Sequence, residues 1–147
     1  MDIASRFGDD EHLAAARTAF GEARGEGLDG QVAVVWVLVN RRDTRGRWGD
    51  TIRDVAFQSY QFSCYGEGPH YAAVEQFPAA SSKGDQRAVV ECMRAADLVL
   101  GGLVEDPTLG ATHYTTAGVY DGPRRPKWAG EELVRIGGHV FFKESKG

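Results

Sequence analysis

Eight apolar residues follow one another without a break from Val32 to Val39, and this run constrains the fold more than any other feature. A segment that is apolar on all sides belongs in the middle of a core. Eight residues are far short of the about 20 that a helix needs to cross a bilayer. Their β-branched content would also suit a buried strand, but the element continues to about Arg42, longer than a usual strand, which favours a helix over 29–42.

Capping residues and apolar spacing predict further helices around this segment. Asp9 or Asp10 is expected to cap a helix that begins near Glu11 and ends at Gly25. Three more helices are expected: a short one capped by Asp50 or Thr51, one over 71–77, and a long one that begins at Ser81 or Ser82 as cap and runs to about Leu103. Residues 59–69 and 107–127 show no period and predict loops, while 134–142 predict a terminal strand or hairpin. The pattern indicates an α+β fold that is mainly helical, with a small β element.

Length and charge narrow the class of protein. A chain of 147 residues predicts one domain over 1–147, with a core over about 9–142. A net charge of -4 argues against nucleic acid as a partner, because phosphate binding needs a clustered basic surface. The first residues lack a Sec signal pattern, which predicts synthesis in the cytoplasm without stable membrane insertion. Cys64 and Cys92 are too few for a disulfide framework, so reduced thiols are expected, with one disulfide as the alternative.

The segment from Phe20 to Gly27 carries the chemistry, with Glu22 and Glu26 set among glycines. Glu22 falls on the last turn of the first predicted helix, where the negative end of the helix dipole opposes ionisation of a carboxyl. Apolar neighbours such as Phe20 oppose it as well. Glycoside cleavage requires such an acid, because a proton must pass to the leaving oxygen. From spacing alone, Glu22 and Glu26 also fit a pair of carboxylates on a solvated face.

Six short motifs stand in sequence order along residues 13–142. They are Ala19–Gly27 (AFGEARGEG), Gly30–Val34 (GQVAV), Val39–Arg41 (VNR), Gln61–Cys64 (QFSC), Ala111–Tyr114 (ATHY) and Ile136–Phe141 (IGGHVF). In combination they resemble the SleB/CwlJ-type cell wall hydrolases, a family that includes the spore-cortex-lytic enzymes. The resemblance implies a lysozyme-like fold, similar to that of lytic transglycosylases and goose-type lysozymes.

The resemblance also implies an activity, which is cleavage of peptidoglycan glycan strands between N-acetylmuramic acid and N-acetylglucosamine. Glu22 matches the family's catalytic acid, and Glu26 is a supporting candidate, either as a charge partner or as an acceptor that stabilises a turn. A lytic transglycosylase needs no protein nucleophile, whereas a muramidase needs a second carboxylate. The candidates for that carboxylate are Glu26, Asp29, Asp50 and Glu67. We expect the transglycosylase outcome, no cofactor or metal, a monomer, and a stand-alone endolysin of phage type that reaches the wall through a holin.

Substrate-binding candidates follow from sugar chemistry, since sugar rings stack on flat apolar surfaces and hydroxyls need polar partners. They are Gln31 on the buried helix, Phe62, Ser63 and Tyr65 on the central loop, His113, Tyr114 and Thr115 on the second loop, and Trp128. Each also has a structural interpretation, such as core packing for Phe62, helix capping for Gln31 and loop packing for Trp128 or Trp48.

Three other functions compete. A zinc amidase or peptidase would draw its ligands from histidines and cysteines, but no two of them show a short metal-binding spacing. A cysteine peptidase would use Cys64 as nucleophile and His113 as base. A peptidoglycan-binding module without catalysis is the third alternative.

Overall fold

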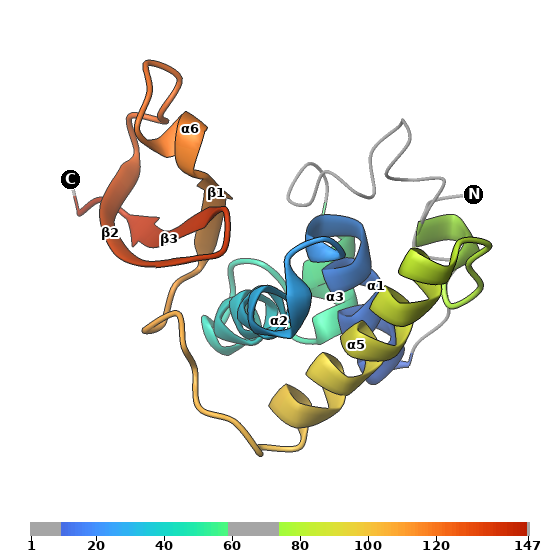
Figure 1. The fold of residues 1–147 in the computed structure, drawn as a ribbon. Coiled ribbons are helices and arrows are strands. Elements are labelled where there is room, and N and C mark those ends of the chain that lie inside the picture. Colours follow the sequence, from blue (N-terminus) through green and yellow to red (C-terminus); the bar gives the residue numbers. More distant parts are fainter. Residues whose placement is uncertain (1–9, 59–73, 147) are drawn as a thin grey trace.

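The computed structural model describes residues 10–58 and 74–146. Its helical part contains α1 (Glu11–Ala23), α2 (Gly27–Asp43), α3 (Ile52–Phe57) and α5 (Lys83–Leu100). The C-terminal part contains β1 (His113–Thr116), the short α6 (Ala117–Tyr120), β2 (Ala129–Ile136) and β3 (His139–Glu144). Figure 1 shows α1, α2, α3 and α5 on one side of the molecule and the sheet with α6 on the other.

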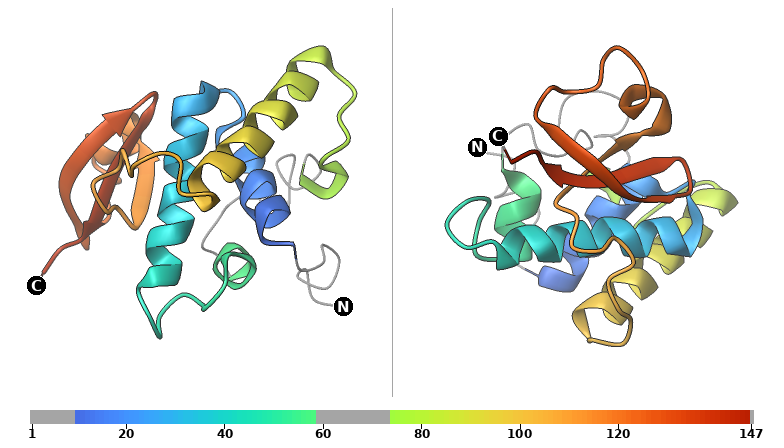
Figure 2. Two further views of the ribbon diagram at one scale, coloured as in Figure 1. Left: turned by 90° about the horizontal axis from the view of Figure 1, so that it is seen from below. Right: turned by 90° about the vertical axis from the view of Figure 1, so that its left-hand side faces the viewer.

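The apolar run Val32–Val39 lies in α2, which confirms the prediction of a helix. Figure 2 shows α2 between the sheet and the other long helices. One side of α2, which includes Val34 and Leu38, packs into the main core with α1 and α5. The opposite side, with Ala33 and Val37, packs on Phe141 of the sheet. The helix is apolar on all sides because it has packing partners on both of these sides.

Side-chain caps set the starts of the other helices. The predicted caps are confirmed for Asp10, Thr51 and Ser82, whose side chains accept bonds from the backbone N–H groups three residues later at 2.8–3.0 Å. Their apolar faces pack into one core, where Phe20 of α1 and Phe77 have ring centroids 5.3 Å apart. The short helix predicted over 71–77 lies partly outside the described residues, and one helical turn is seen at 74–76.

The predicted end of the long helix at 103 is wrong, because α5 ends at Leu100. Gly101 and Gly102, the second with φ of 71°, turn the chain there, and the N–H of Leu103 bonds back to the carbonyl of Leu98 at 2.9 Å. Leu103 is consequently 72% exposed instead of facing the core.

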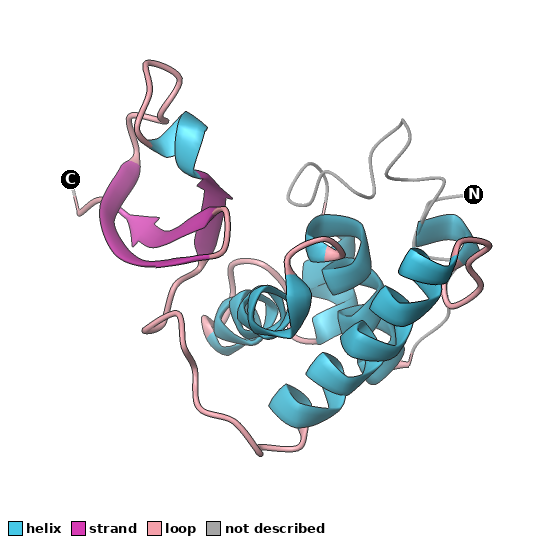
Figure 3. Cartoon of the chain, viewed as in Figure 1, coloured by secondary structure: helices cyan, strands magenta, loops and turns pink. Residues whose placement is uncertain are grey.

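The prediction of a loop over 107–127 is wrong in its middle part, which holds β1 and α6. The sheet has the order β1-β3-β2 and is antiparallel, with His113 opposite Phe142 and Tyr114 opposite Phe141. Strand β1 has only four residues, and its ladder partner lies near the end of the chain, so no local period marks it. The terminal hairpin is confirmed, although β2 begins earlier than predicted, at Ala129, with the exposed Glu131 and Glu132 near its start. Figure 3 shows the three strands gathered at one end of the molecule.

Asp106 anchors the connection between α5 and β1 on α2. Its carboxylate accepts hydrogen bonds from Asn40 Nδ2 at 2.9 Å, from the N–H and hydroxyl of Thr108 at 2.8 and 2.6 Å, and from the N–H of Gly110 at 2.9 Å. Burial opposes its ionisation, but these bonds outweigh that effect and lower the pKa of Asp106. Asn40 also donates to the carbonyl of Ala111 at 2.9 Å. The start of β1 is thereby held against the C-terminal half of α2.

Candidate active site

Glu22 and Tyr114 meet where the helical part faces the sheet. Glu22 lies on the last turn of α1, and Tyr114 is the second residue of β1. The hydroxyl of Tyr114 donates a hydrogen bond to Oε1 of Glu22 at 2.5 Å. The Tyr114 ring packs on Phe141 and His139, with centroid distances of 5.6 and 5.1 Å. A half-buried carboxyl is therefore held by a phenol whose ring is fixed by β3.

Arg41 supplies a buried positive charge beside this pair. Its Nε donates to the carbonyl of Thr112 at 2.7 Å, and its guanidinium lies 5.2 Å from the ring centroid of Trp48. Burial lowers the pKa of Arg41 to about 10, while the charges of Tyr114 and Glu22 act against that shift. The guanidinium remains protonated at neutral pH, so a cation lies close to Glu22.

A groove of about 490 Å³ opens beside Tyr114. Its walls come from the end of α2 and the α2–α3 loop on one side, and from the sheet with the adjoining Trp128 on the other. They are formed by Arg41, Arg47, Trp48, His113, Tyr114, Trp128 and Glu144. An ion pair between Arg47 and Glu144 joins the two walls. The groove thus combines aromatic surfaces with fixed charges, and one of its lining residues, Tyr114, bonds the carboxyl of Glu22.

The aromatic side chains of the groove form one cluster around His113. The His113 ring is stacked on Phe142 at a centroid distance of 5.8 Å and lies 5.0 Å from Trp128 and 5.8 Å from Trp48. Trp128 is 50% exposed, whereas Trp48 is buried. Burial, together with the charge of Arg41, lowers the pKa of His113 to about 4, so this imidazole is neutral at pH 7. Trp128 therefore offers an open aromatic face, and His113 supports it from behind.

Glu26 connects the start of α2 to the hairpin turn between β2 and β3. Its Oε2 accepts a hydrogen bond from the N–H of Gly138 at 3.1 Å, and its Oε1 lies 3.6 Å from Nδ1 of His139. Gly137 has φ of 59°, and a Cβ at this position would run into the Glu26 carboxylate. Of the two roles considered for Glu26, this geometry favours the acceptor that stabilises a turn.

A match to the family described as Cell Wall Hydrolase covers residues 25–142. The chain belongs to this cell wall hydrolase family. It is 27% identical over 145 residues to the spore cortex-lytic enzyme of Halalkalibacterium halodurans, a match that spans 95% of this chain and 37% of that protein. A spore cortex-lytic enzyme of Bacillus cereus is 28% identical over 87% of this chain and 42% of its own length. The chain thus spans less than half the length of these relatives.

Two solved structures share the fold of this cell wall hydrolase. The catalytic domain of the Bacillus cereus SleB protein matches with a TM-score of 0.57 and 26% identity, over 92% of this chain and 93% of that one. The catalytic domain of a germination-specific lytic transglycosylase, SleB from Bacillus anthracis, matches with a TM-score of 0.59 and 24% identity, over 93% and 97%. These matches confirm the predicted fold class, lysozyme-like and mainly helical with a small sheet.

The predicted site residues of the cell wall hydrolase fall into three groups. Tyr114, His113 and Trp128 line the groove, although His113 and Tyr114 lie in β1 and not in a loop as predicted. Thr115 is half-buried in β1 opposite Val140 and is not among the groove residues. Phe62, Ser63 and Tyr65 lie outside the described residues.

Gln31 is fully buried in α2. Its Nε2 lies 3.3 Å from a carboxylate oxygen of Glu91 on α5 and 3.5 Å from the carbonyl of Arg24. These neighbours place the amide between helices instead of on the groove wall, and its predicted contact with substrate stays a prediction.

Arg41 and Glu144 are groove residues to which sequence reasoning assigned no role in the site. Arg41 has a signal in the sequence, because Ala33, Val37 and Arg41 are spaced by four and share the face of α2 that meets the sheet. Glu144 has no such signal, since it stands in the polar end of the chain and reaches the groove only through the register of β3.

The competing chemistries find little support in the described residues. Among residues 10–58 and 74–146, no three His, Cys, Asp or Glu side chains gather as metal ligands. Cys64, the nucleophile considered for a cysteine peptidase, lies outside the described residues. Burial raises the pKa of the Cys92 thiol to about 12, which keeps it unreactive. Within the described part of the chain, no helix is long and apolar enough to cross a membrane.

Proposed function

We propose that this cell wall hydrolase cleaves peptidoglycan glycan strands between N-acetylmuramic acid and N-acetylglucosamine, as a lytic transglycosylase with Glu22 as acid and base. The observation that carries the proposal is the bond from Tyr114 to Glu22 at the wall of an aromatic groove. The similarity to spore cortex-lytic enzymes supports the same class of substrate.

In the first step, Glu22 gives its proton to the oxygen that joins the two sugars. The bond from the anomeric carbon of the muramic acid to that oxygen breaks, and the glucosamine leaves as an alcohol. The carboxylate formed at Glu22 then takes the proton of the C6 hydroxyl of the same muramic acid. The C6 oxygen bonds to the anomeric carbon, which closes a 1,6-anhydro ring and returns the proton to Glu22.

The neighbours of Glu22 suit both steps. Tyr114 holds one carboxyl oxygen of Glu22, and we assign the proton transfers to the other oxygen. The Arg41 cation stabilises the negative charge that appears on Glu22 after the first transfer. Trp128 offers the exposed ring on which a sugar face can stack.

Among the described residues, the carboxylates around the groove favour transglycosylation over hydrolysis; the candidate Glu67 lies outside the described residues. A hydrolase needs a second carboxylate about 5–5.5 Å from the acid for retention, or about 6.5–9.5 Å for inversion. Glu26 is bound to the hairpin turn, and Glu144 is bound to Arg47. An internal C6 hydroxyl removes the need for a carboxylate nucleophile.

The proposal is tested with purified sacculi and mass spectrometry of the released fragments. We expect fragments that end in 1,6-anhydro-muramic acid. Glu22→Gln keeps the shape of the side chain but removes the acid, so we expect activity to fall by about 10³-fold, with an unchanged melting curve. Glu131→Gln, on the exposed side of β2, is the matched control and should retain full activity. Reducing ends in place of anhydro ends would indicate a muramidase, and normal activity of Glu22→Gln would refute the role of Glu22.

Tyr114→Phe tests the contact that carries the proposal. Loss of the hydroxyl leaves the ring packing on Phe141 in place but removes the hydrogen bond to Oε1 of Glu22. We expect kcat to fall by roughly 10- to 100-fold, in the range of one lost positioning contact, while KM changes little. A fall in kcat that is accompanied by a clearly lower melting temperature would show that the hydroxyl acts only on folding.

The role as a phage-type endolysin stays a proposal about how the enzyme reaches the wall. It predicts that expression in a bacterial host lyses the cells only when a holin is expressed as well. Lysis without the holin would contradict it.

A further inference from the structure

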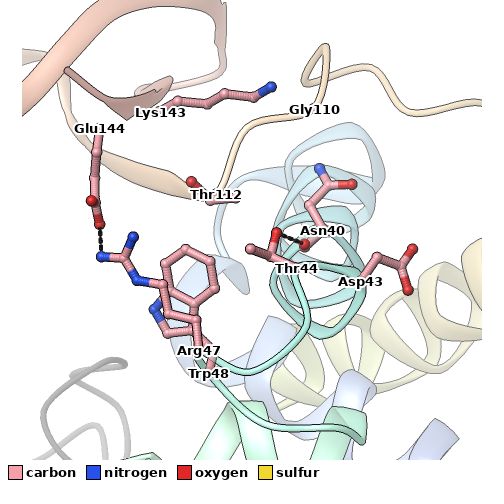
Figure 4. A pocket seen from close by; sticks show the side chains of 9 residues that line it. All are labelled: Asn40, Asp43, Thr44, Arg47, Trp48, Gly110, Thr112, Lys143 and Glu144. Atoms are coloured by element: carbon pink, nitrogen blue, oxygen red, sulfur yellow. Dashed lines mark hydrogen bonds and ion pairs between the residues drawn. The ribbon is translucent and has the colours of Figure 1, made fainter. Parts of the chain in front are cut away.

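A second pocket lies beside the groove, and Figure 4 shows the side chains that line it. It measures about 440 Å³ and lies between the end of α2 and the end of β3. Its walls are formed by Asn40, Asp43, Thr44, Arg47, Trp48, Gly110, Thr112, Lys143 and Glu144. Arg47, Trp48 and Glu144 line both pockets, so a ligand seated in the groove beside Tyr114 can extend directly into the second pocket.

The two pockets differ in chemistry. The groove contains the exposed ring of Trp128 and the cluster around His113, which suit sugar faces. Trp48 is the one aromatic residue among the described residues that line the second pocket; it is buried, and the Arg47 guanidinium lies 4.4 Å from its ring centroid. Charges of both signs line this pocket. Arg47 and Lys143 are positive, and Asp43 and Glu144 are negative. Such a pocket suits a ligand with both carboxylate and amine groups better than it suits a sugar or a polyanion such as a phosphate chain.

Most polar side chains that line the second pocket form hydrogen bonds within the protein, and Lys143 is an exception. Asn40 bonds Asp106 and Ala111, and Thr44 bonds the carbonyl of Asn40. Among the described residues, no hydrogen bond or ion pair involves the Lys143 ammonium, which lies near Gly110 on the sheet side of the pocket. Figure 4 shows Asp43 on the opposite wall. Its carboxylate is 63% exposed and bonds only its neighbour Arg42 at 3.2 Å among the described residues.

We infer that the second pocket binds the peptide that hangs from N-acetylmuramic acid, with a peptide carboxylate on Lys143 and a peptide amine on Asp43. This inference rests on the proposed function, because it requires a glycan strand in the groove. Peptide stems branch from every second sugar of such a strand, and they carry free carboxylates and, in many walls, a free side-chain amine. The enzyme therefore prefers strands whose muramic acids carry peptides over strands without them.

The test compares two forms of one substrate, glycan strands with intact peptides and the same strands after an amidase has removed the peptides. We expect wild-type kcat/KM to be at least 5-fold higher on strands with peptides. Lys143→Met keeps the length of the side chain and removes its charge. The ratio of kcat/KM on strands with peptides to kcat/KM on stripped strands should therefore fall below 2, mainly through KM. Its rate on stripped strands should equal that of the wild type.

The matched control is Lys83→Met, which removes the same charge at the exposed start of α5, and its ratio should equal that of the wild type. Two results would overturn the inference and leave the proposed function intact. One is equal wild-type kcat/KM on strands with peptides and on stripped strands. The other is a Lys143→Met loss of kcat/KM that is the same on both substrates. Cleavage of neither strand by the wild type would overturn the proposed function and the inference with it.

A binding measurement checks the inference without turnover. Glu22→Gln protein is titrated with a disaccharide that carries a tetrapeptide and with the same disaccharide alone. We expect about 5- to 10-fold tighter binding of the peptide form, and loss of this difference when Lys143→Met is added. Equal affinities for the two ligands would refute the peptide contact.

Discussion

The helical part and the sheet are held together by different means. The helices α1, α2, α3 and α5 share one apolar core that includes Phe20, Leu38 and Ile52. The sheet meets α2 through a small cluster in which Ala33 and Val37 pack on Phe141 and Ala111. Polar bonds complete this contact, from Asp106, Arg41 and Glu26.

This difference matters because the proposed catalytic pair spans the boundary. Glu22 belongs to the helical part, and Tyr114 belongs to the sheet. The apolar core holds Glu22 in place, while the position of Tyr114 depends on a contact that is small and largely polar. Changes in the core should therefore affect the whole fold, whereas changes at the boundary should affect the sheet and the groove first.

Leu38→Ala tests the helical part and should have the largest effect on stability. Leu38 is 0% exposed in the main core, so its truncation leaves a cavity and should lower the free energy of unfolding by about 4 kcal/mol. Denaturant unfolding, monitored by circular dichroism, measures this free energy of unfolding. Leu103→Ala removes the same atoms from a residue that is 72% exposed, so it should change stability by less than about 0.5 kcal/mol. Equal losses for the two variants would contradict this account of the core.

His113 makes the sheet side sensitive to acid. Burial lowers its pKa from 6.5 to about 4 in the folded protein, so between these values the unfolded chain binds the proton first. The neutral His113 side chain makes its full contribution to the free energy of unfolding above about pH 6.5. This contribution is lost as the pH falls to 4, by up to about 3 kcal/mol. Urea unfolding at several pH values measures it, and His113→Gln should show a shallower slope between pH 4 and 6.5. The same slope in both proteins would refute this role.

Asp106→Ala tests the polar attachment of the sheet and should have the smallest effect of the three. It leaves N–H groups of Thr108 and Gly110 without their acceptor, at a cost of about 2 kcal/mol. Relative to the wild type, we expect hydrogen exchange to become faster in β1 and β3 but not in α2, and we expect reduced activity. Glu105→Ala, at an exposed position next to Asp106, is the control. Uniformly faster exchange in α2 and the sheet would show that the two parts do not differ.

Local sequence predicted the helical part well. The caps at Asp10, Thr51 and Ser82 and the burial of α2 follow from short-range rules that need only neighbouring residues. The same rules placed Glu22 at the end of α1. They failed for β1, because a strand of four residues is recognisable only through its partner β3.

The sequence by itself determined the mainly helical fold, the terminal hairpin, the family resemblance and the candidate acid Glu22. Only the tertiary structure decided that Tyr114 reaches Glu22 across 92 positions of the chain, and that Arg41 and Glu144 line the groove. The physical reason is that capping and periodic burial depend on residues a few positions apart. A contact between distant residues depends instead on the register of β1 on β3 and on how the sheet docks on α2.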